Sequence, residues 1–343
     1  MINGHGNNLY QFDIQSLEAD FSSNVAFNNH SVKILDFLSG NMACLSNYPD
    51  PMATKLTAQI AAYHGVSAES VLVTNGSTEA FYLLAHHLAS KAGAQATRTA
   101  ITTPSFAEYE DSCALFNHAI EHVSLKDFRE IDPSALDSIW LASPNNPDGY
   151  RISLEDIYVV ASRSASCTIV LDRAYNELSS DAQVCCHLPE NVALVESFTK
   201  FYGIPGLRLG YIVASPTLIA SLNCLRVPWS VNALSIMAGE YVMSNLDSLQ
   251  LNINELIGES EYLQKSIESI DGFRVERSNC NFFLVEITGG GNAKMLYNYL
   301  VENHGLLVRD CSNFNALGDN YIRIAAQSRA SNQKLIAALK QWR

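Results

Sequence analysis

Five segments of this chain repeat one local pattern, in which a short apolar run leads into a turn rich in glycine, proline or asparagine and then into a helical stretch. The apolar runs begin near positions 71, 100, 139, 167 and 192. Short buried strands that alternate with helices are typical of a parallel sheet, and the residues that follow such strands meet at one sheet edge. The pattern predicts an α/β fold whose functional residues gather at the carboxyl edge of a mostly parallel sheet.

The composition limits the partners that such a chain can have. Its 343 residues, 48% hydrophobic and 17% charged, are enough for a large core and for two domains. The net charge of -13 argues against a nucleic-acid partner, because phosphate binding needs a basic surface. The sequence contains neither G-x-G-x-x-G nor G-x-x-x-x-G-K-S/T, which argues against a dinucleotide or a nucleoside triphosphate as the ligand.

Signals of membrane insertion and export are also missing from the sequence. No apolar run is long enough to span a membrane, and no signal peptide opens the chain. The eight cysteines are scattered without a C-x-x-C pair, so we expect reduced and mostly buried thiols. We therefore expect a cytoplasmic protein with no membrane partner and no bound metal.

Lys200 lies in the stretch with the most specific chemistry. An apolar run precedes it, and the glycine- and proline-rich sequence after it predicts a loop at the end of a strand. A lysine amine in such a place can form a Schiff base with a carbonyl. Ser197, Thr199 and Arg208 can hold a phosphate beside it. The set indicates pyridoxal 5'-phosphate (PLP), a carbonyl cofactor with a phosphate. A surface lysine near a loop arginine is the alternative for this stretch alone.

The strand that begins at Val71 supplies a second candidate for phosphate binding. It runs into Asn75 and Gly76, and Ser77 or Thr78 is expected to cap the helix that follows. The first turn of a helix leaves backbone N–H groups free to bind an anion. Many strand-to-helix junctions share this form, so this junction indicates phosphate binding only in combination with the stretch around Lys200.

Side chains at three other strand ends are suited to contact the ring of PLP. Phe106 can stack on a flat ring, although a core aromatic is the alternative for such a residue. Asn146, in an N-P-x-G turn, can donate to a phenolate oxygen, and Tyr175 can add a second hydrogen bond there. Asp172 closes an apolar strand, and a buried carboxylate needs a partner such as a pyridinium N–H.

The last third of the chain is expected to form a second domain. We expect residues 1–30 to form an arm that packs with the small domain, residues 31–230 a large PLP-binding domain, and residues 231–343 a small α/β domain. Arg323 lies inside an apolar strand, where an arginine needs an anionic partner. It is a candidate clamp for a substrate carboxylate, and a salt bridge within the chain is the alternative. Ser331 is expected to cap the final helix.

Taken together, these motifs resemble the class I and II aminotransferase family of fold-type I PLP enzymes. The matching motifs are N-G-S-T-E, N-P-x-G, D-x-A-Y and S-x-T-K with an arginine eight residues beyond the lysine. The resemblance extends from about residue 20 to residue 340 and implies an aspartate aminotransferase-like fold and a homodimer. It also implies that Lys200 carries the cofactor, that Asp172 pairs with the pyridine nitrogen, and that Arg323 binds a substrate carboxylate.

The same resemblance implies roles for the other matching residues. Asn146 and Tyr175 bind the phenolate oxygen, and Phe106 stacks on the ring. The implied phosphate ligands are Gly76, Ser77, Thr78, Ser197 and Arg208, with Tyr48 reaching in from the second subunit.

Two branches of the family are similar to this chain. The Tyr-Pro-Asp-Pro turn is similar to that of histidinol-phosphate aminotransferases. A closer resemblance is to the threonine-phosphate decarboxylase branch of the cobalamin pathway, and it rests on residues 5–8, 106–109, 199–211, 228–234 and 309–314. The substrate-binding residues expected from this resemblance are His5, Asn8, Asn24, Arg309 and Arg323.

Three positions depart from these patterns, and three functions stay open. Asn7 stands where the decarboxylases have glycine, the stretch from Ser23 lacks the usual N-I-N-P, and Arg173 stands where glutamate is usual. None of these removes a PLP contact, whereas the first two touch the substrate side. The favoured function is decarboxylation of L-threonine O-3-phosphate, and the alternative is transamination of histidinol phosphate or another amino acid. A PLP-binding homologue without turnover is the third hypothesis, and the intact lysine and aspartate argue against it.

Overall fold

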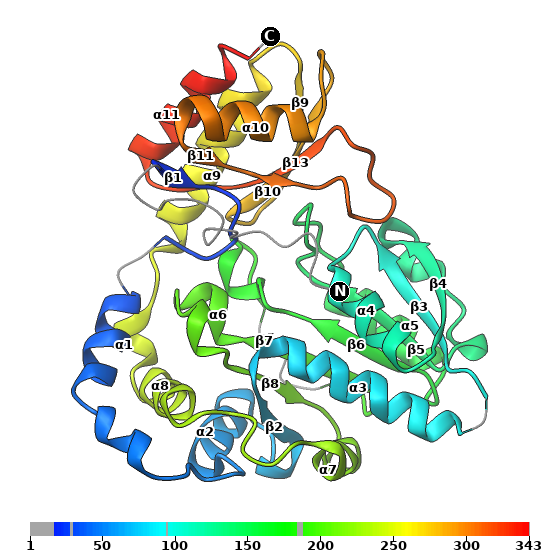
Figure 1. The fold of residues 1–343 in the computed structure, drawn as a ribbon. Helices are drawn as coiled ribbons and strands as arrows, with labels where there is room; N and C mark the ends of the chain where they lie inside the picture. The colour runs from blue at the N-terminus through cyan, green and yellow to red at the C-terminus, as the bar shows by residue number, and fades with distance from the viewer. Residues whose placement is uncertain (1–16, 28–29, 94, 184–187, 343) are drawn as a thin grey trace.

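A computed structural model describes residues 17–27, 30–93, 95–183 and 188–342, which form two α/β parts (Figure 1). The larger part is built on a seven-stranded sheet with the order β2-β8-β7-β6-β5-β3-β4. Its strands are β2 (Val71–Thr74), β3 (Arg98–Thr103), β4 (Ala119–Ser124), β5 (Ser138–Ala142), β6 (Thr168–Asp172), β7 (Val192–Ser197) and β8 (Gly210–Val213).

The strand directions place six strand ends at one edge of this sheet. Of the seven strands described, β8 alone runs against its neighbours, and the pairs among β3 to β7 are parallel. The carboxyl ends of β2, β3, β4, β5, β6 and β7 therefore meet at one edge, where β8 begins. The predicted α/β fold with a mostly parallel sheet is confirmed.

Helices cover both faces of the large sheet, which explains why its strands are continuously apolar. One face packs against α3 (Gly76–Ala92), α4 (Ala107–Leu115) and α7 (Pro216–Leu225), with Phe81 and Leu222 in its core. The other face packs against α1 (His30–Ser39), α2 (Thr54–His64), α5 (Leu154–Arg163) and α8 (Ala233–Ser244), with Leu56 and Val242 in its core.

The smaller part is built on a four-stranded antiparallel sheet that lies above the large sheet in Figure 1. Its order is β12-β13-β10-β9, and its helices are α9 (Ile253–Glu268), α10 (Ala293–His304) and α11 (Arg329–Leu339). Its strands are β9 (Phe273–Glu276), β10 (Phe282–Ile287), β12 (Arg309–Asp310) and β13 (Tyr321–Ala325).

The first described residues of the chain pack with this smaller part. Strand β1 (Ala19–Asp20) pairs in parallel with β11 (Leu306–Leu307), and Phe21 lies in the small core. Helix α8, by contrast, packs on α1 and α2 through residues such as Val242. The division at residue 230 stays a proposal, and residues 233–244 pack with the large part.

Three local predictions were wrong. Helix α3 begins at Gly76, so Asn75 precedes it and neither Ser77 nor Thr78 caps it. Helix α11 is capped by Ser328, whose hydroxyl accepts the N–H of Ser331, because two serines three residues apart offer the same local signal. Lys200 lies in the one-turn helix α6 (Phe198–Phe201) rather than in a loop.

Within the described ranges, no helix is long and apolar enough to cross a lipid bilayer.

Candidate active site

Lys200 follows β7 at the carboxyl edge of the large sheet. The Ser197 hydroxyl accepts the N–H of Thr199 at 3.2 Å and so starts the short helix that carries the lysine. Burial, followed by the guanidinium groups of Arg323 and Arg208, lowers the pKa of Lys200 to about 8, while Asp172 opposes that shift. The amine is therefore far more often neutral near pH 8 than an ordinary lysine.

Asp172 ends the neighbouring strand β6 and is 4% exposed. Its Oδ2 accepts from the Tyr109 hydroxyl at 2.6 Å, and its Oδ1 accepts from the N–H of Ala174 at 2.9 Å. Burial raises the pKa of Asp172 to about 6, while Tyr109, Ala174 and Lys200 lower it. The carboxyl group is thus held in place by two hydrogen-bond donors. It also lies close enough to Lys200 for the charge of that lysine to lower its pKa.

Tyr109 is a site residue that the sequence did not identify. It lies on α4, three residues after Phe106, and is fully buried against Phe81 and Trp140. One helical turn separates the predicted ring-stacking residue from this tyrosine, so the F-x-x-Y spacing was the available signal. Its partner Asp172 is 63 residues away in the chain, and no local pattern indicates that contact.

The first turn of α3 forms a tight cradle with Arg208 and Gly210. A Cβ at Gly76 would come within 2.7 Å of the Arg208 Nη2 atom, and Gly76 has a φ of +73°. A Cβ at Gly210 would come within 2.7 Å of the Ser77 N atom. Both positions require glycine, and they bring an exposed guanidinium against a helix N-terminus. Ser77 and Thr78 lie half-buried in the same turn.

Arg323 and Asn146 meet between the two parts of the molecule. The Nη1 of Arg323 donates to the Asn146 Oδ1, and its Nη2 donates to the Ser22 carbonyl at 2.6 Å. The guanidinium lies 5.9 Å from the Phe282 ring centroid. Because the Asn146 oxygen is engaged by the arginine, the amide N–H groups are its donors to a ligand.

Arg309 lies directly beside Arg323 on the neighbouring strand. The two are Cα partners of β12 and β13, and both are under 10% exposed. Arg309 donates to the Asn313 Oδ1 at 2.6 Å and to the Asp310 carbonyl. Burial, followed by the charge of Arg323, lowers the pKa of Arg309 to about 10. Among the described residues, no carboxylate forms an ion pair with either arginine.

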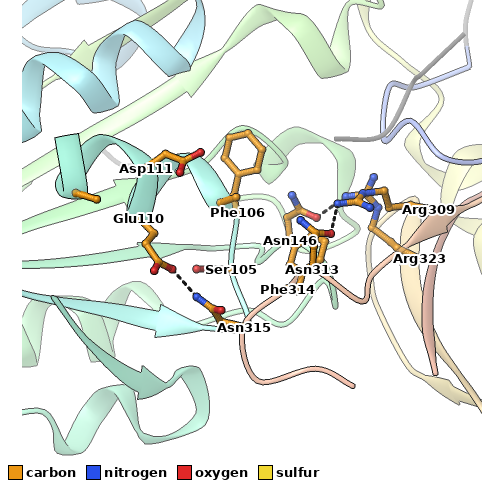
Figure 2. Close-up of a pocket in the computed structure, with 12 residues that line it drawn as sticks. Ser105, Phe106, Glu110, Asp111, Asn146, Arg309, Asn313, Phe314, Asn315 and Arg323 are labelled. Carbon is orange, nitrogen blue, oxygen red and sulfur yellow. Dashed lines mark hydrogen bonds between the residues drawn. The ribbon is translucent and has the colours of Figure 1, made fainter. Parts of the chain in front are cut away.

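Asn146, Arg309 and Arg323 line a cavity of about 220 Å³. Figure 2 shows Asn146, Arg309 and Arg323 on one side, Phe106 beside them, and Glu110 with Asn315 farther off. The Glu110 carboxylate accepts from the Asn315 amide and lies 3.2 Å from the His122 Nε2 atom. This contact joins α4 of the large part to the loop between β12 and β13 of the small part. The cavity therefore has a cationic wall and an acidic rim.

Two other predicted residues lie against this region from the small-domain side. Tyr175 is 7% exposed and packs edge-on against Phe282, with ring centroids 4.8 Å apart. Asn24 is 1% exposed, and its amide lowers the pKa of Tyr175 against the larger effect of burial, which raises it. The structure thus brings Asn24 beside the predicted cofactor residues.

One predicted residue is not brought into the site of this chain, and two others lie outside the described part of it. Tyr48 is 85% exposed and lies against Trp229, with ring centroids 5.3 Å apart. Its position suits a contact with another subunit and not with Lys200 of the same chain. His5 and Asn8 lie outside the described residues.

The residues at this edge fit PLP. The glycine cradle with Arg208 suits a phosphate, the buried Asp172 suits a pyridinium nitrogen, and the amine of Lys200 suits an aldehyde. Phe106 and Asn146 line the cavity that also holds Arg309 and Arg323. Among the described residues, no group of three or more His, Cys, Asp or Glu side chains is placed to hold a metal ion.

Comparison with protein families agrees with this fit. The model of aminotransferase class I and II matches residues 24–339. The chain belongs to this family. Members of the family are PLP-dependent enzymes, so the predicted cofactor and enzyme class are confirmed.

Individual relatives come from the two branches that the motifs indicate. A threonine-phosphate decarboxylase from Salmonella typhimurium is 30% identical over 337 residues, which cover 94% of this chain and 90% of the relative. A histidinol-phosphate aminotransferase from Ruminiclostridium cellulolyticum is 28% identical over 312 residues, with coverages of 86% and 83%. The solved L-threonine-O-3-phosphate decarboxylase from Porphyromonas gingivalis is 34% identical, with a TM-score of 0.88 and coverages of 94% and 98%.

Proposed function

We propose that this chain is a PLP-dependent decarboxylase of L-threonine O-3-phosphate or of a close analogue. The observation that carries the proposal is the pair of neighbouring buried arginines, Arg309 and Arg323, which have only neutral hydrogen-bond partners among the described residues. Buried charges require compensation, so this cavity suits a substrate that brings two anionic groups. A phosphorylated amino acid carries a phosphate and a carboxylate.

The site residues have distinct tasks in this proposal. Bound PLP supplies an electron-withdrawing ring that stabilises negative charge at the substrate Cα. Asp172 provides the carboxylate for the ring nitrogen, and the Gly76 turn with Arg208 provides the phosphate cradle. Arg309 and Arg323 hold the two anionic groups and so fix which bond at Cα faces the reaction. For decarboxylation, CO₂ leaves Cα and a proton takes its place.

Lys200 is the proposed covalent anchor and the proposed proton carrier. Its pKa near 8 lets the amine accept and return a proton near neutral pH, where an ordinary lysine stays charged. Phe106 and Phe314 line the cavity beside the arginine pair, and the Arg309 guanidinium lies 5.3 Å from the Phe314 ring centroid. Lys200 and Asp172 carry the chemistry in this proposal, and Tyr175 supports the ring oxygen.

Transamination is the alternative function, and the relatives include it. A transaminase that uses glutamate also handles two anionic groups, so the arginine pair alone does not separate the reactions. The decarboxylase is favoured because the P. gingivalis structure, at 34% identity, is more similar than the histidinol-phosphate aminotransferase from Clostridium acetobutylicum, at 24%. The place in cobalamin biosynthesis follows from the same assignment.

One incubation separates the two reactions. The PLP-loaded protein is mixed with L-threonine O-phosphate, with and without 2-oxoglutarate. Release of CO₂ without the keto acid marks the decarboxylase. Formation of glutamate that depends on the keto acid marks the aminotransferase, and it would overturn the proposed reaction.

The proposal includes a homodimer with shared sites, because Tyr48 is exposed and the family resemblance places it at the partner's phosphate. Hybrid dimers of Tyr48→Ala and Lys200→Ala subunits place both lesions in one site and leave the other intact. Mixing the two weakened variants should restore activity, up to about half per hybrid. A lack of recovery after verified subunit exchange would show that Tyr48 does not act across an interface.

A further inference from the structure

Arg173 and Glu196 lie next to the cofactor residues but on the opposite face of the sheet. Asp172 of β6 pairs in register with Val195 of β7, and the N–H of Arg173 donates to the Val195 carbonyl at 2.8 Å. Arg173 and Glu196 are thus the next residues on adjacent strands. Because side chains alternate across a sheet, both point away from the face on which Tyr109 contacts Asp172.

The partner of Glu196 supports that placement. Its Oε2 accepts from the Tyr211 hydroxyl at 2.8 Å, and Tyr211 belongs to the core on the α2 side of the sheet. His64 of α2 lies 3.1 Å from the same hydroxyl. The carboxylate is therefore held under the strand ends by a buried hydrogen-bond chain.

A second carboxyl group, that of Glu177, lies near Glu196 on the α2 side of the sheet. It follows β6 on the short turn Asn176–Leu178, and the Tyr63 hydroxyl lies 3.5 Å from its Oε1. Burial, followed by the charge of Glu196, raises the pKa of Glu177, and Arg173 opposes that effect. We call Arg173, Glu177 and Glu196 the charge cluster. It holds two carboxyl groups and one guanidinium.

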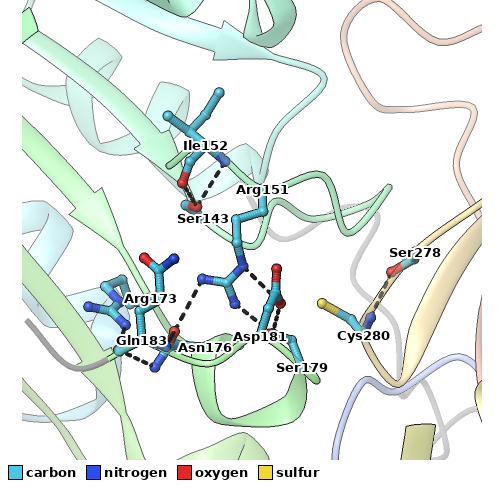
Figure 3. A network of polar contacts seen from close by, with 10 residues as sticks. All are labelled: Ser143, Arg151, Ile152, Arg173, Asn176, Ser179, Asp181, Gln183, Ser278 and Cys280. Carbon is cyan, nitrogen blue, oxygen red and sulfur yellow. Dashed lines mark hydrogen bonds and ion pairs between the residues drawn. The ribbon is translucent and has the colours of Figure 1, made fainter. Parts of the chain in front are cut away.

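The guanidinium of this cluster contacts the segment that follows Glu177. Arg173 is 4% exposed, and its Nη2 donates to the Gln183 carbonyl, which also accepts from the Asn176 amide at 3.0 Å (Figure 3). Arg151 secures the same segment through an ion pair with Asp181 at 3.1 Å. The positive charge of Arg173 opposes the effect of Glu196 on the pKa of Glu177, so the guanidinium acts on the carboxyl groups of this cluster.

We propose that Arg173 is a positioning residue for cofactor binding, which compensates the carboxylate of Glu196 and thereby holds the ends of β6 and β7, with Asp172 and Lys200, in place. Without this compensation, one partially buried carboxylate would stand alone beneath the strand ends, and such a charge is costly. It would also act on Asp172, because the charge of Glu196 raises the pKa of that group. The proposal concerns PLP binding and is independent of the reaction that follows.

The cluster faces titratable groups from every neighbouring element. On its own face these are tyrosines and a histidine, and across the strand ends they are the two cofactor residues. The groups are Tyr63, His64, Tyr202, Tyr211, Asp172 and Lys200. Burial raises the pKa of Tyr63, Tyr202 and Tyr211, so these three stay neutral. Glu177 is also mostly protonated near pH 7, which leaves the charges of Arg173, Glu196 and the two cofactor residues.

The test measures the PLP dissociation constant of the apoprotein as a function of pH, with thermal melting as the check of folding. In the wild type, PLP binding should weaken as the pH falls through about 6, where Asp172 takes up a proton. Arg173→Gln should weaken binding about tenfold at neutral pH, or about 1.4 kcal/mol. It should also move the onset of weakening to higher pH, because uncompensated Glu196 favours protonation of Asp172.

Compensating and control variants make the test specific. Arg173→Gln combined with Glu196→Gln should recover most of the affinity and the wild-type pH profile, and Arg173→Lys should keep most of both. Glu196→Gln alone should move the onset to lower pH, which remains measurable if Arg173→Gln fails to fold. Glu177→Gln is the matched control, and it should change affinity less than about twofold, because its carboxyl is already held protonated.

Two results would overturn the proposal. One is a wild-type affinity and pH profile in Arg173→Gln. The other is a double variant that binds PLP as weakly as Arg173→Gln does. Because no step uses L-threonine O-phosphate, a failed decarboxylase assay would leave this outcome unchanged.

Discussion

The proposed cofactor side and the proposed substrate side of the site hold their charges in opposite ways. On the cofactor side, Asp172 has two donors from its own chain and the opposite charge of Lys200 nearby. On the substrate side, Arg309 and Arg323 are buried beside each other and meet only neutral oxygens among the described residues. One side is electrostatically complete, and in the proposed function the other gains its compensation from the substrate.

This difference matches how long the cofactor and the substrate are each expected to stay bound. A cofactor that stays bound through many turnovers can be held by groups that also stabilise one another. A substrate must enter and leave, and paired like charges give a strong attraction that only an anionic molecule satisfies. The comparison predicts that changes on the cofactor side affect rate and cofactor retention, whereas changes on the substrate side affect KM.

The largest effect is expected for Lys200→Ala. Loss of the covalent anchor and proton carrier should reduce turnover by about a thousandfold or more. The absorbance band of protein-bound PLP should disappear after dialysis, while Lys265→Ala, a change at an exposed lysine, should keep it. A borohydride-reducible adduct that persists in Lys200→Ala would show that another lysine carries the cofactor.

Asp172→Ala should have the next largest effect. This variant should still bind PLP through the phosphate cradle, but turnover should fall by about a hundredfold or more, since a main electrostatic contribution is lost. Steady-state rates at saturating substrate provide the measurement. Turnover near that of the wild type would contradict the assigned role.

The variant Arg323→Met tests the proposed substrate side of the site. KM for L-threonine O-phosphate should rise about a hundredfold, as expected when one buried charged partner is removed. The melting temperature of the apoprotein should not fall, because the replacement removes an uncompensated buried charge. Arg329→Met, at an exposed arginine paired with Glu259, serves as the control. A strongly destabilised Arg323→Met apoprotein would mean that the arginine serves the fold.

The smallest effect is expected for Tyr109→Phe. The hydroxyl lowers the pKa of Asp172, so its removal should raise that pKa above about 6. The carboxylate form binds the ring nitrogen, predominates above this pKa and is lost as the pH falls through it. PLP affinity should therefore weaken at a higher pH than in the wild type, with a loss of about fivefold near neutral pH. A fluorescence titration of the apoprotein with PLP checks this, and an unchanged pH profile would argue that Tyr109 serves packing alone.

The sequence predicted the sheet and most cofactor-side residues because their signals are local. An apolar strand, a turn residue and a polar side chain occur within ten residues, and the parallel arrangement then collects them at one edge. The contacts of Tyr109 with Asp172 and of Arg323 with Asn146 span 63 and 177 residues, and no local pattern encodes them. The assigned roles of the individual site residues stay predictions until the variants are measured.

Helix termini and the lysine conformation were harder to predict for a different reason. Hydroxyl residues cluster at the starts of α3 and α11, and the backbone decides which of them becomes the cap. The glycine and proline residues that follow Lys200 do end the helix. They lie beyond Phe201, so one helical turn that includes the lysine forms before them. Arg173 appeared as a departure from the family pattern, and its neighbours Glu177 and Glu196 became apparent only through the strand register.

The reversed direction of β8 has a consequence for how this enzyme tolerates insertions. Because β7 and β8 are antiparallel, Ser197 and Gly210 are paired, and the chain between them forms a loop closed by the sheet itself. Lys200 and Arg208 both lie inside this loop. Surface loops usually absorb extra residues at little entropic cost. Here an added residue would leave the strand pairing intact and change the spacing between the amine and the guanidinium, so we expect the proposed cofactor contacts, and not the stability of the fold, to limit the length of this loop.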